Sequence, residues 1–176
     1  MLLNVAREYS SQARELRGLF EKQLKELYWA EMTMLPLLDD TIENTFSRDL
    51  VAALHEHKTQ TAIHVLRLEK IFKAIGIKVI AERYEALACL MKEGENFIAE
   101  IKKGVVRDAG IISVLQKIKH YEIACYGTMK AYALALKEED VVTWLEDTLE
   151  EEKEADLLLS SIAESHVNVE AADKEI

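Results

Sequence analysis

The 176-residue chain has little of what ends helices or cross-links loops: six glycines, one proline and two cysteines. Sheet proteins need more turn residues than this, so the composition favours an all-helical protein. Cys89 and Cys125 lack CxxC or other metal-ligand spacing. Because both lie within apolar helical patterns, we expect them to be small buried residues of a protein from a reducing compartment.

Long apolar runs and basic segments are also missing. No stretch reaches 18 uninterrupted apolar residues, and the first residues have neither a cationic start nor a signal-peptide core, so we expect no membrane span and a cytoplasmic protein. The formal net charge is −10, without a basic tail or patch. Nucleic acid is therefore not an expected partner, because nonspecific binding depends on neutralising phosphates.

Helix-period apolar stripes cover most of the chain. They predict four long helices at about 12–43, 48–75, 108–136 and 138–166, with a shorter one at about 83–102 in the connection between the second and third. Gly76 is expected to end the second helix. We expect one domain over residues 1–176, with an ambiguous lead-in at 1–11 and a frayed tail at 167–176.

Each long helix has a polar residue where its stripe should be apolar. In the last helix, two carboxylates share a stripe with leucines, and ionised carboxylates are costly to bury unless something positive meets them. Single acids interrupt the first and third stripes, and two histidines with Thr61 between them interrupt the second. The candidate ligands are Glu31, His57, His64, Glu122, Glu152 and Asp156.

Two interpretations of this pattern remain open. Mid-helix positions of a bundle can meet at one level, and converging carboxylates and imidazoles suit a pair of iron or manganese ions. Taken singly, the residues have plainer roles: Glu122 could pair with a buried Tyr or Lys, and His57 could be a hydrogen-bonded core histidine. The alternative is a metal-free polar core held by hydrogen bonds.

Several segments resemble the ferritin-like family of bacterial stress proteins named after YciE and YciF, over about Leu16 to Glu164. The matching segments are LRGLFEKQLKELYWAE around Glu31, His57 to Thr61 with RLEKIF, GVVRDAGI, HYEIACYGT around Glu122, and TLEEEKEAD around Glu152. The resemblance implies a ferritin-like four-helix bundle with an extra helix in the crossover between helices 2 and 3, and a homodimer. It also implies kinship with rubrerythrins and ferritins.

The family kinship implies a di-metal site with one Glu from each of two helices and an acidic/His pair from the other two. On that basis we expect Glu31, Glu122 and Glu152 to bridge two iron or manganese ions in a stress-associated protein. Such a di-metal site would be expected to react with peroxide or oxygen, or to handle iron. The chain departs from the pattern at two positions. Gln60 stands where relatives commonly have Glu, and Ala155, three residues after Glu152, stands where ferritin-type sites have His. These departures motivate the alternative, a non-enzymatic helical dimer.

Overall fold

The computed structural model describes residues 15–173, and these form helices without a strand. In chain order the helices are α1 (Leu16–Asn44), α2 (Arg48–Ala74), α3 (Glu85–Glu100), α4 (Val105–Ala135), α5 (Glu139–Ile162), the π-helical turn η1 (Ala163–Val167) and α6 (Asn168–Asp173). No helix in this range combines the length and apolar character needed to cross a membrane.

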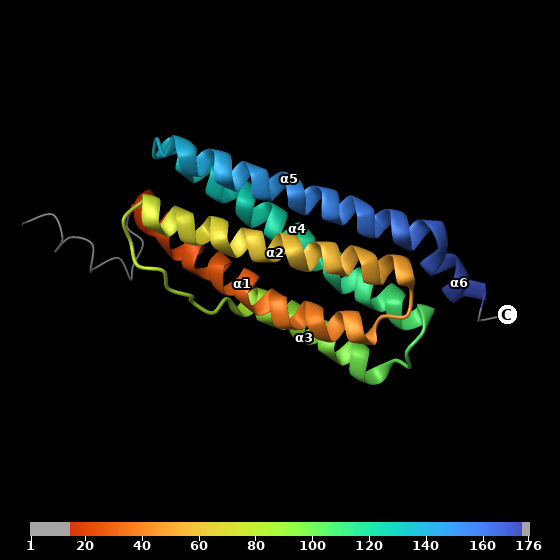
Figure 1. Cartoon of the computed structure of the whole chain (residues 1–176). Coiled ribbons are helices and arrows are strands. Elements are labelled where there is room, and N and C mark those ends of the chain that lie inside the picture. The colour runs from red at the N-terminus through yellow and green to blue at the C-terminus, as the bar shows by residue number, and fades with distance from the viewer. Residues whose placement is uncertain (1–14, 174–176) are drawn as a thin grey trace, which may run out of the picture.

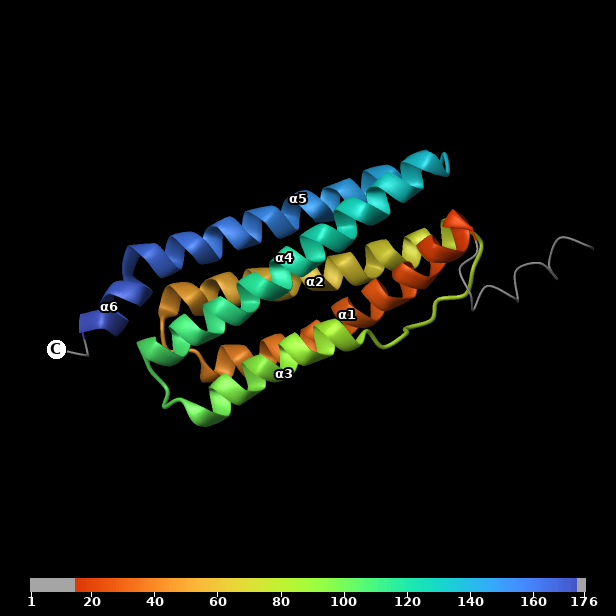
Figure 2. The same cartoon turned by 180° about the vertical axis from the view of Figure 1, so that it is seen from behind.

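The four long helices form a bundle made of two antiparallel pairs (Figure 1). Helix α1 packs along α2, and α4 packs along α5. The pairs meet through α2 against α5 and α1 against α4. Helix α3 covers the outside of α1 and α4, as the view from behind shows (Figure 2). The predicted all-α bundle with an extra helix in the crossover is therefore confirmed.

The bundle core consists of two apolar clusters, one toward each end. One cluster includes Met34, Leu54 and Ile118, and the other includes Phe20, Phe72 and Leu145. Each long helix contributes to both clusters, as its stripe predicted. Between the clusters the helices bury polar side chains instead.

The tail that was expected to fray begins as a short helix where the structure describes it. Residues 168–173 form α6, which continues from η1 and packs against α4. Val167, just before α6, is fully buried in the apolar cluster near Ile162. Helix α6 itself has no buried residue, so it has no apolar period to detect. The predicted lead-in at 1–11 and the tail's last residues, 174–176, lie outside the described range.

The expectation for the cysteines holds only in part. Cys125 on α4 is half-buried, but Cys89 on α3 is exposed. Helix α3 buries only Leu87 and Met91 against the bundle, so it lies on the surface as a covering element. A short apolar period on a covering helix does not bury every apolar residue that it contains.

Two long helices end in the same hydrogen-bond pattern with different residues. Gly76 ends α2 as predicted, with a φ of 73°, and the N–H of Ile77 donates to the carbonyl of Phe72. After α4, Lys137 adopts a φ of 60°, and the N–H of Glu138 donates to the carbonyl of Ala133. The left-handed conformation costs a residue with a Cβ about 1–2 kcal/mol.

We therefore expect Lys137→Gly to stabilise the protein. Part of the relieved strain is offset by the greater freedom of glycine in the unfolded chain, so the net gain is about 0.5–1 kcal/mol, or roughly 1–4 °C in Tm. Thermal unfolding followed by circular dichroism measures the gain. The reverse change, Gly76→Ala, should lower Tm, and a lower Tm for Lys137→Gly would contradict the strain argument.

Candidate metal centre

The polar side chains of the four long helices meet midway along the bundle. Glu31 lies on α1 between Leu27 of one apolar cluster and Met34 of the other. His64 occupies the corresponding level of α2, and Glu152 that of α5. All three side chains are buried, with at most 1% of each residue exposed.

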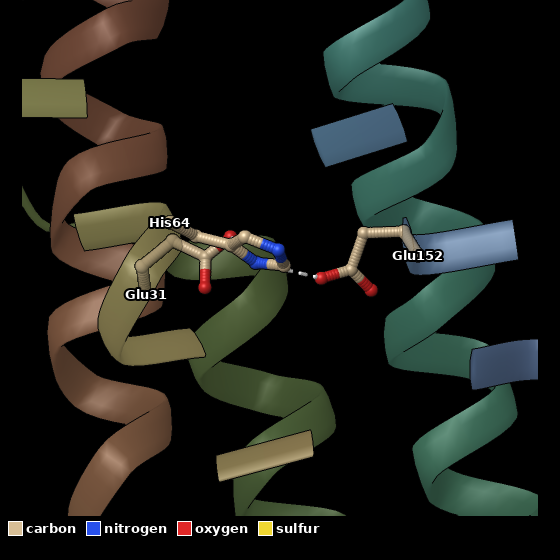
Figure 3. A group of neighbouring side chains, drawn as sticks. All are labelled: Glu31, His64 and Glu152. Atoms are coloured by element: carbon tan, nitrogen blue, oxygen red, sulfur yellow. Dashed lines mark ion pairs between the residues drawn. The ribbon is translucent and has the colours of Figure 1, made fainter. Parts of the chain in front are cut away.

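Three of these residues offer metal-ligating atoms that lie within 4.8 Å of one another: Glu31, His64 and Glu152. Nδ1 of His64 is 3.2 Å from Oε1 of Glu152 and 3.5 Å from Oε1 of Glu31. Figure 3 shows the imidazole ring directed toward the Glu152 carboxylate, with Glu31 beside it. One imidazole and two carboxylates from three helices thus converge on one point.

The opposite edge of the His64 ring is held from outside the group. Nε2 of His64 lies 2.8 Å from Oε2 of Glu151. Arg67 binds the same carboxylate through two N–H groups, at 2.7 and 2.9 Å, and donates to Thr148 as well. This bidentate pair lowers the pKa of Glu151, and it fixes the carboxylate that orients the imidazole.

Glu31 is oriented by a tyrosine. The buried hydroxyl of Tyr126 on α4 donates a 2.6 Å hydrogen bond to Oε1 of Glu31. Burial and the Glu31 carboxylate raise the pKa of Tyr126, so the phenol stays protonated and remains a donor. The second oxygen of Glu31, Oε2, has no hydrogen-bond partner among residues 15–173.

Charges within the group determine the protonation of His64. Burial alone would lower the pKa of His64, but the carboxylates of Glu31 and Glu152 raise it to about 10. Burial would likewise raise the pKa of Glu152, but Lys119 and His64 hold it below its usual value. Without a metal ion the group is therefore an imidazolium between carboxylates.

A second cation, Lys119 of α4, lies beside the group. Its side chain is 1% exposed, and Nζ is 2.6 Å from Oε2 of Glu122 and forms an ion pair with Oε2 of Glu152. Burial alone would lower the pKa of Lys119, but Glu122 and Glu152 raise it above its usual value. Burial and the carboxylates of Glu152 and Glu31 raise the pKa of Glu122, although Lys119 acts to lower it.

The other sequence candidates lie at different distances from this group. Glu122 is fully buried and joins it through Lys119. His57 is buried on α2 about two helical turns before His64, and both of its ring nitrogens lack a hydrogen-bond partner in the described chain. Asp156 is on the edge of the bundle, 3.2 Å from the exposed ring of His120. Metal ligation by these three residues stays a prediction.

Lys119 is the main residue that the sequence interpretation missed. Lys119 is four residues after the buried Leu115 and three before Glu122. That spacing places it on the same face. A lysine at an inward position of a stripe already containing an acid was the available signal. The sequence left open that Glu122 pairs with a buried Tyr or Lys, and Lys119 is such a lysine.

An all-helical bundle with carboxylate and imidazole groups buried between its facing helices is the class that the fold and the site define. Within that class, the chain belongs to the family described as a domain of unknown function (DUF892), which matches residues 15–172. It is 31% identical over 162 residues to protein YciF of Escherichia coli (strain K12), covering 92% of this chain and 98% of YciF. The resemblance to the YciE and YciF family that was found from the sequence is confirmed, and the kinship with rubrerythrins and ferritins stays a prediction.

Solved structures agree with this assignment. The crystal structure of the E. coli stress protein YciF matches with a TM-score of 0.84 at 31% identity, covering 88% of this chain and 98% of that one. YcfI from Rhodopseudomonas palustris matches with a TM-score of 0.83 at 34% identity, covering 87% and 98%. A protein from Xanthomonas campestris shares the fold, with a TM-score of 0.70 at 16% identity, covering 92% and 100%.

Proposed function

We propose that this stress-protein homologue binds a divalent transition-metal ion, iron or manganese, through Glu31, His64 and Glu152. The observation that carries the proposal is the orientation of His64. Its Nδ1 faces two carboxylates while its Nε2 is held by Glu151. Histidines that ligate metals characteristically donate a hydrogen bond from the N–H of their other ring nitrogen to an acceptor such as a carboxylate, and this bond fixes the ring orientation and the tautomer.

The donor atoms present fit such an ion. Among residues 15–173, Oε2 of Glu31 is buried and has no hydrogen-bond partner, while the buried Nδ1 of His64 and Oε1 of Glu152 form an ion pair at 3.2 Å without a hydrogen bond of good geometry. Buried polar atoms are normally satisfied, so the free oxygen of Glu31 needs an explanation. An oxygen-rich set with one nitrogen suits iron or manganese.

A bound iron or manganese ion would supply redox chemistry toward peroxide or oxygen. The chain's own residues would hold the site in shape: Glu151 with Arg67 fixes the ring of His64, and Tyr126 fixes the carboxylate of Glu31. The apolar clusters on either side exclude water. The homodimer and the cytoplasmic location expected from the sequence stay predictions.

Titration of chelator-treated protein with Mn²⁺, followed by calorimetry and elemental analysis, tests the proposal. We expect stoichiometric binding by the wild type. His64→Gln and Glu31→Gln should each weaken it by at least about 10- to 100-fold, the loss caused by removing even an outer partner of a ligand. His55→Gln is the matched control, because His55 is exposed on the same helix.

The metal-free polar core remains the second candidate, because Lys119 already pairs with two of the acids. It predicts no stoichiometric Mn²⁺ or Fe²⁺ binding by the wild type. It also predicts that His64→Gln and His55→Gln behave alike in the titration. Either result would exclude the metal proposal.

A further inference from the structure

Glu152 divides its two carboxylate oxygens between two positive groups. Oε1 faces Nδ1 of His64 at 3.2 Å, within the proposed metal site. Oε2 forms the ion pair with Lys119 on the other side. A carboxylate that serves two cation positions, one from each oxygen, is a bridging carboxylate, and here one of the positions is filled by an ammonium group from the chain itself.

The acids around Lys119 complete this second position. Oε2 of Glu122 lies 2.6 Å from Nζ of Lys119, and neither oxygen of Glu122 forms a hydrogen bond of good geometry within residues 15–173. Glu122 therefore interacts with Lys119 mainly through charge. The Lys119 side chain is as buried as Glu152, each residue being 1% exposed, so this charge is not shared with solvent.

We propose that the Lys119 ammonium permanently fills the second cation position of this centre, so that the chain takes one metal ion where a two-metal bundle takes two. This inference rests on the proposed function for the first position. A second divalent ion would need Glu122 and Oε2 of Glu152 as ligands, and both are already paired with Lys119. Bringing an ion next to a buried ammonium would also add strong repulsion.

The surroundings of Lys119 could hold a metal ion if the lysine were removed. A cavity of about 70 Å³ lies between α2, α4 and α5, and its lining includes His57, Lys119 and Ala155. Both ring nitrogens of His57 lack a partner in the described chain. Burial is the largest cause of the lowered pKa of His57, and it remains when the lysine is removed, so it still favours a neutral ring that can donate to a metal ion.

The experiment counts metal ions in Lys119→Ala and in the matched control Lys117→Ala, which removes an exposed lysine on the same helix. Chelator-treated proteins are loaded with Mn²⁺, passed through a desalting column and analysed for manganese per chain. We expect one ion in the wild type and in Lys117→Ala, and two in Lys119→Ala. The double variant Lys119→Ala, His57→Ala should bind the second ion at least about 10-fold more weakly than Lys119→Ala.

The outcomes separate this inference from the proposed function. One ion in both the wild type and Lys119→Ala would overturn the role of Lys119 and leave the first site standing. Two ions in the wild type would also overturn it. None in the wild type with one or more in Lys119→Ala would support Lys119 as the occupant of a cation position but reject the native metal site. None in either protein would reject both.

A second variant covers the case in which Lys119→Ala does not fold. Lys119→Glu exchanges the internal cation for one more carboxylate, so its acids would need metal ions for neutralisation. We expect saturating Mn²⁺ to raise its Tm over that in chelator by roughly 10 °C more than it raises the wild-type Tm. Equal shifts in the two proteins would overturn the inference.

Discussion

Glu152→Gln is expected to lower the free energy of unfolding by about 3–5 kcal/mol in the presence of chelator, the loss typical of breaking a buried ion pair from one side. Glutamine keeps the shape of the side chain but removes the charge that faces Lys119 and His64. Both cations would stay buried with less compensation. Chemical denaturation gives the free energy, and the corresponding fall in Tm is roughly 6–20 °C.

Glu150→Gln is the matched control for this change. Glu150 lies on the same helix but is exposed, and its partner Lys153 is three residues further on. Exposed pairs of this kind contribute little, so we expect a change within about 0.5 kcal/mol. Equal effects of the two substitutions would mean that the polar layer is solvated in solution and that Glu152 is not buried there.

Asp108→Ala is expected to cost about 2–4 kcal/mol, although Asp108 is far from the metal centre. Asp108 is fully buried in the first turn of α4, and its carboxylate accepts from the backbone N–H of Ser47 at 2.6 Å and of Phe46 at 3.0 Å. It therefore fixes the turn between α1 and α2 to the start of α4. Hydrogen bonds to charged groups contribute about 1.5–3 kcal/mol each.

Two further variants make the Asp108 prediction specific. Asp108→Asn keeps one acceptor oxygen and should lose about half as much stability as Asp108→Ala. Asp147→Ala removes an exposed aspartate of α5 and should have little effect. Thermal and urea unfolding of all three proteins would check the order, and an Asp108→Ala protein as stable as Asp147→Ala would refute the role of the carboxylate.

Periodicity along single helices was enough to predict the bundle and part of its centre. Glu31, His64 and Glu152 each replace an apolar residue at the middle of a stripe, and the structure brings all three together. The signal was strong because burying an acid is costly wherever it occurs along the chain.

Pairing across helices was harder to predict, because a stripe gives the face of a residue but not its partner. Asp156 is four residues after Glu152, yet it turns toward His120 at the edge of the bundle. Lys119 was overlooked because lysine is usually solvated, and its burial depends on two acids from different helices. Both outcomes depend on how α4 lies against α5, which neither helix specifies alone.

The position of the polar layer at the seam between the two helix pairs has a consequence for assembly. The α1–α2 pair brings Glu31 and His64, and the α4–α5 pair brings Lys119, Glu122 and Glu152. Apolar stripes tolerate sliding, because one leucine can replace another as a neighbour. A slip of one helical turn between the two pairs, about 5.4 Å, would keep the ion pairs of Lys119 but would separate His64 from Glu152 and Glu31 from Tyr126. It would leave Glu31 and His64 buried without these partners. The same residues that face the proposed metal thus select a single register for docking the two halves of the bundle.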